Sequence, residues 1–398
     1  MKNNEGLIRT VMTVLVTAAV VFVATSSYYI DNVTVGKNET KYDYSGDFTK
    51  LKKVLNLVED DFLFEEYTME ELEEGAIRGM LDALEDPYTS YFDMSETEEF
   101  LLETEGEYEG VGMYITYGTD LEWPMVLSPL KNSPAEEAGV KPGDYIYAIE
   151  DIDITADMTL EEVSHLLKGK AGTKVKVTFV RYNEENKQEK YTVELQRRKI
   201  EISPFEVEVK DGNIGYIAFT SFDEGTDKKF KEAYKDLIKN KGVKGIIIDL
   251  RNNPGGLLNV ATNIADILVP NGIITYTLDK DGNKKTEYSD SSQTEVPLVV
   301  LINENSASAS EIVSAAIKAH DVGKIVGKTS YGKGLVQEFA SLGDGTYVKL
   351  TIAEYFSPDG IKINGIGVVP DVEIEENEDS DADEQLEKAL EVMKEQIY

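Results

Sequence analysis

The chain has 398 residues, 41% of them hydrophobic, and a formal net charge of −35. Its length allows two or three domains with at least one full-sized core, and its negative charge argues against nucleic-acid binding because phosphate backbones are repelled. The sequence has no cysteine, and its two histidines are His165 and His320. This composition excludes disulfides, thiolate catalysis and cysteine-based metal sites, and it disfavours a zinc site with several histidines, so we expect no metal.

An apolar segment follows two positive charges at the start of the chain. Lys2 and Arg9 precede the uncharged residues 11–25, a run of 15 residues that is short for a membrane span of about 20. We interpret residues 1–30 as a secretory signal peptide or an uncleaved signal anchor, because the run lacks the amphipathic face of a surface-packed core helix. The positive charges predict that the remaining chain lies outside the cytoplasm, either secreted or membrane-anchored.

A polar linker and a helical region follow. Residues 31–45 are rich in Asn, Lys and Tyr, and in residues 46–104 the apolar positions of DFTKLKKVLNLVEDDF recur at helical spacing. A second helix, TMEELEEGAIRGMLDALED, opens with a capping signal, Thr68 followed by Glu71. The region is too small to be an enzyme, so we expect it to make interfaces.

Residues 105–198 are predicted to form a β-rich module. Short strands are predicted at YEGVGMYITY and WPMVLSPL, and longer alternating strands at KVKVTFVRY and KYTVELQRR. An amphipathic helix, TLEEVSHLLKGKAGT, lies between them and ends in glycine. The pattern predicts one compact module of about ninety residues.

Residues 199–372 alternate between predicted strands and helices. VKGIIIDLR and PLVVLIN have the apolar centres of strands in a sheet that is covered on both faces, and the helices GLLNVATNIADILV and SASEIVSAAIKAH follow them. The fold class is therefore α/β, within a multidomain chain. Residues 373–398 are predicted to be an acidic tail that ends in a charged helix.

Two strand-to-helix junctions are candidates for catalysis. GIIIDL runs into RNNPGGLL, whose proline and two glycines make a tight turn with exposed backbone N–H groups; these suit an oxyanion, and equally any sharp loop. PLVVLIN runs into ENSASASEI, which places serines at a helix start beside the end of a buried strand, where α/β sheets hold reactive groups. Capping and close packing are the alternative for these serines, and Ser310 and Glu311 suit the first helical turn.

A lysine is the favoured base. His320 lies twelve residues beyond Ser308 on the same predicted helix, about 18 Å along its axis, and His165 lies in the β-rich module. A lysine acts as a base when desolvation lowers its pKa from about 10.4. In TSYGKGLVQ, Lys333 stands between two glycines, and Gln337 follows four positions later as a neutral amide that orients a lysine without raising its pKa. A surface role is the alternative for Lys333.

Several motifs together resemble the carboxyl-terminal processing peptidases. The motifs are ENSASASEI, GKTSYGKGLVQ, the upstream DLRNNPGG, the downstream SPDGIKINGIGVVPDV, and GAIRGMLDALEDPYTSYFD in the helical region. The β-rich module resembles the PDZ domain that these proteases carry. The resemblance covers roughly residues 46–372 and implies a crotonase-like catalytic core with an inserted PDZ domain and an N-terminal helical region.

The resemblance also implies a serine-type endopeptidase that needs no cofactor. Its nucleophile would be Ser308 and its base Lys333, 25 residues later, with support from Gln337. Ser308 Oγ would attack a peptide carbonyl, neutral Lys333 would take the proton, and water would hydrolyse the acyl-enzyme. The oxyanion hole would use backbone N–H groups of Gly255 or Gly256, plus Ala309.

The PDZ resemblance implies that the module binds the C-terminal carboxylate of a protein substrate. Backbone N–H groups of a glycine loop would cap the carboxylate while the chain end adds as a β-strand. The candidate loop residues are Gly110, Val111, Gly112 and Met113. Candidates for the pocket wall are Val163, His165 and Leu166, although core packing explains Val163 and Leu166 equally well. Arg181 is a candidate for reporting ligand binding to the catalytic core, with a solvated strand-end arginine as the alternative.

Three functions remain open at this point. The favoured one is an endopeptidase that acts on protein C-termini outside the cytoplasm. A catalytically silent PDZ scaffold is the alternative, which intact Ser308, Lys333 and Gln337 disfavour; an acyl-CoA enzyme of the crotonase fold is disfavoured by the signal-like N-terminus and the acidic surface. A homodimer is expected through the N-terminal helical region and the C-terminal helix, because neither is expected to bury its apolar face alone.

Overall fold

The computed structural model describes residues 48–64, 66–117, 123–155, 158–182, 187–290, 294–375 and 382–397. The predicted signal segment and linker, residues 1–45, lie outside them. Within the described residues, no helix is long and apolar enough to cross a membrane. The chain divides into two compact units: the first combines the described residues up to Thr97 with Gln337–Ile352, and the second holds the remainder.

The first unit contains the predicted helices α2 (Thr49–Asp61) and α3 (Met69–Asp82). The predicted capping box is present at α3, where the Glu71 amide donates to Thr68 Oγ1 at 3.1 Å and the Thr68 amide donates to Glu71 Oε2 at 2.6 Å. After β1 (Ser90–Phe92) the helix α4 (Met94–Thr104) begins.

A hairpin from the other end of the chain completes this unit. β17 (Leu335–Ser341) pairs with β18 (Tyr347–Phe356), and β1 pairs antiparallel with β18. The Phe339 ring stacks on Tyr347 with centroids 4.4 Å apart. The sequence did not predict this pairing, because strands so far apart in the chain leave no local signal of their partnership.

The β-rich module of the second unit has a five-stranded path with the order β3-β4-β5-β7-β8. Its strands and helices are β3 (Met113–Tyr117), β4 (Pro124–Pro129), α5 (Pro134–Glu137), β5 (Tyr145–Ile149), β6 (Ile152–Asp153), α6 (Leu160–Leu167), β7 (Lys174–Tyr182) and β8 (Gln188–Gln196). β3 is an edge strand, so one side of its backbone is open to a further strand. The chain enters and leaves the module through an antiparallel pair, β2 (Glu107–Gly110) and β9 (Arg198–Glu201).

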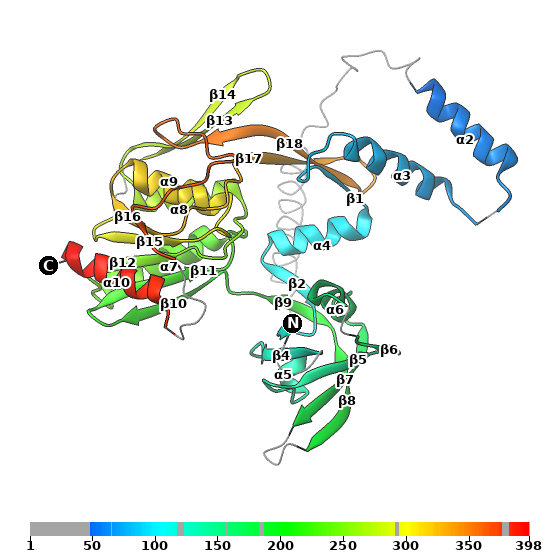
Figure 1. Ribbon diagram of the computed structural model, residues 1–398, viewed down its shortest axis with the longest axis horizontal. Coiled ribbons are helices and arrows are strands. Elements are labelled where there is room, and N and C mark those ends of the chain that lie inside the picture. Colours follow the sequence, from blue (N-terminus) through cyan, green and yellow to red (C-terminus); the bar gives the residue numbers. More distant parts are fainter. Residues whose placement is uncertain are drawn as a thin grey trace, which may run out of the picture. The chain divides into compact units, whose positions relative to one another are not determined.

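The α/β core of the second unit is built on a six-stranded sheet of order β10-β11-β12-β15-β16-β19 (Figure 1). All neighbouring strands from β11 to β19 are parallel, and β10 is antiparallel to β11. The strands are β10 (Phe205–Lys210), β11 (Ile214–Phe219), β12 (Gly245–Asp249), β15 (Leu298–Ile302), β16 (Gly323–Gly327) and β19 (Val372–Glu373). A hairpin of β13 (Gly272–Asp279) and β14 (Lys284–Ser289) pairs with β18 instead.

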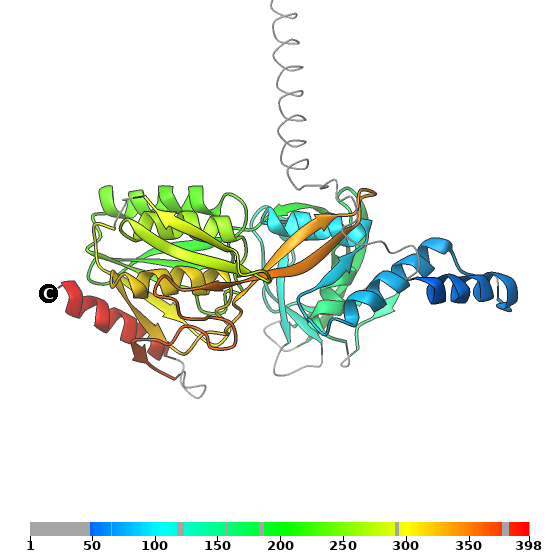
Figure 2. The same ribbon diagram turned by 90° about the horizontal axis from the view of Figure 1, so that it is seen from above.

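Helices cover both faces of this sheet, as the apolar strand centres predicted. Ile246 and Ile248 face a cluster that includes side chains of α7 (Thr226–Lys239), α8 (Leu258–Leu268) and α9 (Ala309–Ala319). Ile247 faces the other side and packs with α10 (Glu384–Ile397), the red helix in Figures 1 and 2.

The C-terminal helix differs from its prediction. α10 buries Ala389, Val392 and Met393 against the sheet, so it belongs to the core and is no separate tail. Its apolar face is therefore covered within the chain, which removes the argument for α10 as a dimer contact. α2 has no buried residue, and its Leu57 is 60% exposed, so the same argument still holds for the N-terminal helix.

Candidate active site

Three neighbouring parallel strands deliver three loops to one edge of the core sheet. β12, β15 and β16 lie side by side, so their carboxyl ends meet there. The following loops, residues 250–256, 303–308 and 328–334, are joined by backbone bonds: the Ala307 amide donates to Asn253 O and the Tyr331 amide to Ser306 O, each at 3.0 Å. The two predicted junctions and the lysine loop therefore converge.

Asparagine side chains fix the first two loops together. Asn252, at φ +57°, donates its amide to Asn303 Oδ1 at 2.9 Å and accepts from Asn303 Nδ2 at 2.9 Å. Fully buried Asn253 accepts the Gly255 amide at 2.8 Å and donates to Phe219 O at 3.2 Å. No local pattern predicted these contacts; the available signal was asparagine's tolerance of positive φ, and it applies to Asn252 alone among the three.

The three serines of the motif have different environments. Ser306 Oγ donates to Leu250 O at 2.7 Å, Ser310 Oγ donates to Asn253 O at 3.1 Å, and both side chains are fully buried. Ser308 is partly exposed at the start of α9, with φ +54° and ψ −112°, a conformation that non-glycine residues rarely adopt. The geometry thus gives Ser306 and Ser310 structural roles and sets Ser308 apart.

One buried carboxylate ties Ser308 to Lys333. Glu311 Oε2 accepts the backbone amides of Ser308 and Lys333, each at 2.9 Å. Glu311 Oε1 accepts the Gly332 amide at 2.7 Å and the Ser330 hydroxyl at 2.6 Å. Burial raises the pKa of Glu311, and the hydrogen bonds from these four groups act in the opposite direction. The sequence pointed only to Glu311's position in the first helical turn and missed this contact.

The Tyr355 hydroxyl forms a second link. It lies 3.1 Å from Ser308 O and also contacts Lys333 O, so it donates to one carbonyl at a time. Tyr355 is buried on β18, and its amide donates to Gly334 O at 2.9 Å. No sequence pattern pointed to Tyr355, because it lies outside both catalytic motifs.

Glycines bring another segment close to Lys333, which is itself partly buried. A Cβ atom on Gly334 would lie 2.3 Å from Asn364 N, and one on Gly332, at φ +86°, would lie 3.1 Å from Gly367 N. Only glycine fits against the backbone at such distances. The downstream motif SPDGIKINGIGVVPDV thus packs on the lysine loop.

The backbone amides proposed for the oxyanion hole differ in whether they already donate a hydrogen bond. The Gly255 amide is engaged by Asn253, whereas the amides of Gly256 and Ala309 have no hydrogen-bond partner within the part of the chain that the structure describes. Gly255 lies against the serine, since a Cβ on it would be 2.8 Å from Ser308 Cβ and 3.0 Å from Ala309 N. Gly255 thus has the contact with Ser308 and Gly256 has the open amide, so the choice between them as oxyanion donor stays a prediction.

The remaining predicted catalytic and basic residues lie elsewhere. Gln337 belongs to the first unit, where its amide donates to Thr351 Oγ1 at 3.4 Å, so its support of Lys333 stays a prediction. His320 ends α9 with Nε2 2.8 Å from Ile273 O, and His165 is exposed on α6. The described residues include no group of three or more metal-ligating side chains that could hold a metal ion.

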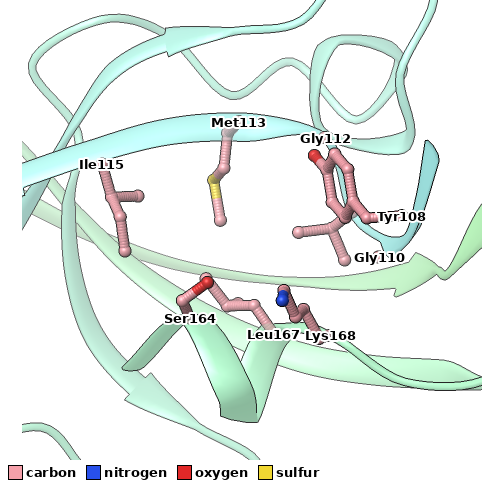
Figure 3. A pocket seen from close by; sticks show the side chains of 9 residues that line it. Tyr108, Gly110, Gly112, Met113, Ile115, Ser164, Leu167 and Lys168 are labelled. Carbon is pink, nitrogen blue, oxygen red and sulfur yellow. The ribbon is translucent and has the colours of Figure 1, made fainter. Parts of the chain in front are cut away.

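The β-rich module carries an open groove between β3 and α6 (Figure 3). Its lining residues are Tyr108, Gly110, Val111, Gly112, Met113, Ile115, Ser164, Leu167 and Lys168. All four predicted loop residues line this groove. From α6, however, it is lined by Ser164, Leu167 and Lys168 in place of the predicted residues. Val163 is fully buried in the module core, Leu166 packs partly against that core, and His165 faces solvent.

Arg181 is committed to an internal ion pair. Its guanidinium donates to both carboxylate oxygens of Asp144, at 2.6 and 2.7 Å, and to Gly139 O at 2.9 Å. The Asp144 side chain is fully buried; burial raises its pKa, but the bonds from Arg181, the Lys141 amide and Tyr191 hold it below the ordinary value. These contacts give Arg181 a structural role within the module and differ from a solvated arginine, while its role as a ligand reporter stays a prediction.

Three family models match the chain. Peptidase family S41 matches residues 213–374, the PDZ domain matches residues 125–181, and the N-terminal domain of the activating protease CtpB matches residues 14–97. Over 364 residues the chain is 33% identical to the carboxy-terminal processing protease CtpA of Bacillus subtilis (strain 168), covering 91% of this chain and 75% of that protein. It is 34% identical to a probable CtpA-like serine protease of Staphylococcus aureus (strain COL), covering 91% and 71%.

Solved structures are similar over most of the chain. The photosystem II D1 C-terminal processing protease is 32% identical with a TM-score of 0.52, covering 83% of this chain and 88% of that one. A putative S41 protease from Bacteroides fragilis NCTC 9343 has a TM-score of 0.55 at 18% identity, covering 80% and 90%, and shows the shared fold.

Proposed function

Because this chain belongs to the carboxy-terminal processing proteases of peptidase family S41, which makes it a serine-type protease, we propose that Ser308 and Lys333 form its catalytic dyad. The observation that carries the proposal is the Glu311 carboxylate, which accepts the backbone amides of both residues. A buried group that binds both chain segments fixes the distance between them. The hydroxyls of Ser306 and Ser310 donate buried structural hydrogen bonds, which leaves Ser308 as the nucleophile.

The proposed reaction proceeds through an acyl-enzyme. Ser308 Oγ attacks the substrate carbonyl carbon while neutral Lys333 takes the hydroxyl proton, and the oxyanion is stabilised by the Gly256 and Ala309 amides. Lys333 then donates that proton to the leaving amine as the peptide C–N bond breaks. Water attacks the ester with Lys333 again as base, which frees the new carboxyl end and restores Ser308.

The groove of the β-rich module is the proposed site for substrate C-termini. β3 is an edge strand, so an extended chain end can pair with it, and the glycine loop at its start supplies backbone donors for a carboxylate. Met113, Ile115 and Leu167 give the groove apolar walls for the side chain of the last residue. The substrates are therefore protein chains with a free α-carboxylate and an apolar end.

We also propose where the protein acts and how its copies assemble. We propose that the activity lies on the extracytoplasmic side, secreted or membrane-anchored, because an uncharged apolar run follows Lys2 and Arg9 in the sequence. A homodimer through α2 is favoured by its unburied apolar face, which includes Val54 and Leu57. Replacing both residues with aspartate is expected to halve the mass measured by light scattering; an unchanged mass removes α2 as the contact.

Cleavage of an unfolded protein tests the dyad. Ser308→Ala and Lys333→Ala are expected to lower kcat/KM by roughly 1,000-fold or more, because each removes a group of the covalent step. Lys324→Ala, at an exposed lysine, is the matched control and is expected to cleave like the wild type. Equal cleavage by all variants contradicts the site, and an inactive wild type supports the silent-scaffold alternative.

The pH profile tests the lysine base separately. Activity is expected to rise with pH as the Lys333 ammonium loses its proton, because only the neutral amine accepts a proton from serine. A profile that is flat from about pH 5 to about pH 10 counts against a lysine base.

A further inference from the structure

Tyr108 lies inside the groove that is proposed to take substrate C-termini. It is on β2, at the register position opposite Ile200 of β9, and its ring lies against the glycine loop. A Cβ atom on Gly110 would be 2.9 Å from Tyr108 Cε2, so the ring rests directly on that glycine. Figure 3 shows the hydroxyl of Tyr108 directed toward Gly112.

The backbone donors of the loop point into the same space. Met113 is paired with Pro129 in the β3–β4 ladder, and the adjoining bond runs from the Leu130 amide to Gly112 O at 3.0 Å. In an antiparallel ladder this pattern makes Met113 and Pro129 a non-hydrogen-bonded pair, so the Met113 amide points away from β4 toward the open side of the edge strand. A peptide carboxylate that added to this edge would be met by that amide.

The Tyr108 hydroxyl lies close to these donors in the groove. Burial raises the pKa of Tyr108 to about 12, and the amides of Gly112 and Met113, as hydrogen-bond donors to the phenol oxygen, act to lower it. The phenol is therefore neutral at ordinary pH. A carboxylate is a stronger acceptor for backbone amides than a neutral hydroxyl, because charge-assisted bonds are about twice as strong.

We propose that the Tyr108 hydroxyl occupies the position of the substrate carboxylate in the unliganded groove, and that a free chain end binds by displacing it. The inference rests on the proposed C-terminus-binding function of the module. It makes Tyr108 a specificity-determining residue: a chain end that carries a negative charge replaces the hydroxyl, whereas an uncharged end, which is a weaker acceptor, leaves the hydroxyl in place.

Lys168 lines the other wall of the groove. Its ammonium is held by Glu99 at 2.6 Å and Glu103 at 3.1 Å, both on α4, and its stem lines the groove opposite the loop.

Peptide binding to the full chain tests the displacement. The background is Ser308→Ala, which prevents cleavage, and the probes are a fluorescein-labelled decapeptide that ends in valine with a free carboxylate and the same peptide as its carboxamide. Tyr108→Phe keeps the ring but removes the competing oxygen, so the carboxylate peptide is expected to bind about 3- to 10-fold more tightly in fluorescence anisotropy. The affinity for the carboxamide peptide is expected to stay within about twofold.

A second tyrosine serves as the control, and two different results would contradict the displacement and the groove function separately. Tyr114→Phe, at an exposed tyrosine of β3, is expected to leave both affinities unchanged. If the parent protein prefers the carboxylate peptide but Tyr108→Phe binds it equally or more weakly, the displacement is overturned and the C-terminus-binding function stands. If neither protein prefers the carboxylate peptide, the proposed function of the groove falls, and the role of Tyr108 falls with it.

Discussion

Glu311 is the residue on which the geometry of the proposed dyad depends. Its carboxylate accepts four hydrogen bonds in a fully buried place, two of them from the backbones of Ser308 and Lys333. Loss of an acceptor leaves buried amides unsatisfied, which costs about 1–3 kcal/mol for each group. The residue thus connects core stability with the placement of both reacting side chains.

Replacing Glu311 with glutamine separates these effects from the serine and lysine themselves. The amide keeps one acceptor oxygen but turns an NH2 group toward backbone donors, so kcat is expected to fall by roughly 10- to 100-fold and stability by about 1–3 kcal/mol. Steady-state kinetics and chemical denaturation measure the two changes. Glu304→Gln, at an exposed glutamate of the same loop, is the control, and equal behaviour of the two variants contradicts the role of Glu311.

Asp144 gives a prediction about acid stability. Its pKa lies below the ordinary 3.8: burial raises it, and the bonds from Arg181 and other donors more than offset that effect. A carboxyl whose folded pKa is depressed stabilises the fold above its unfolded pKa and loses that contribution as the pH falls through the folded pKa. Asp144→Asn is therefore expected to lower the thermal midpoint at neutral pH, with a smaller difference below about pH 3.8. A difference that is constant down to about pH 2.5 contradicts this account.

At the residue scale the sequence alone did not distinguish the serines. Ser306, Ser308 and Ser310 share one local pattern, and only the family resemblance selected Ser308. The features that separate them are tertiary: the partners of the outer two serines, Leu250 O and Asn253 O, come from a loop far earlier in the chain. Tyr355 was missed for the same reason.

At the scale of single elements, periodicity predicted most strands and helices but not the rotation of a helix. α6 has apolar residues around more than one face, and sequence reasoning chose Val163 and Leu166 for the groove. The structure buries Val163 in the module core and places Ser164 and Leu167 at the groove. The choice depends on the position of α6 relative to β3, which no local pattern contains.

Filling the groove tests this face of α6. Ser164→Phe places a ring where the last substrate side chain is proposed to lie, so the affinity for a carboxylate-ended peptide is expected to fall by about 10-fold or more. His165→Phe places the same phenyl ring at the adjacent exposed position and is expected to leave the affinity unchanged. The result that contradicts the observed face is weaker binding by His165→Phe with unchanged binding by Ser164→Phe.

At the scale of the whole chain, distant segments complete each layer. α10 returns to cover one face of the core sheet, and Arg251, directly after β12, forms ion pairs with Asp249 at 2.6 Å and with Asp383, just before α10, at 2.7 Å. The sequence predicted a charged helix here but not its docking, because its acidic composition suggested a solvated tail. β1 likewise pairs with β18, which comes far later in the chain.

Met393 tests whether α10 is part of the core. Its side chain is fully buried, and a Cβ on Gly245 of β12 would meet its sulfur at 2.2 Å, so the two segments are in direct contact. Met393→Ala is expected to lower stability by about 2–5 kcal/mol, as for other large-to-small core changes. Glu391→Ala, at an exposed position of α10, is the control; equal denaturation midpoints for the two variants contradict the docking of this helix.

The measurement that tests the Ser308–Lys333 dyad most directly is the mapping of a serine-directed fluorophosphonate adduct by peptide mass spectrometry. The account predicts one adduct, on Ser308, in the wild-type protein. It also predicts that Lys333→Ala is labelled at least about 100-fold more slowly, because the hydroxyl loses the base that activates it. An adduct on Ser306 or Ser310, or wild-type labelling of Ser308 in Lys333→Ala, would contradict the dyad.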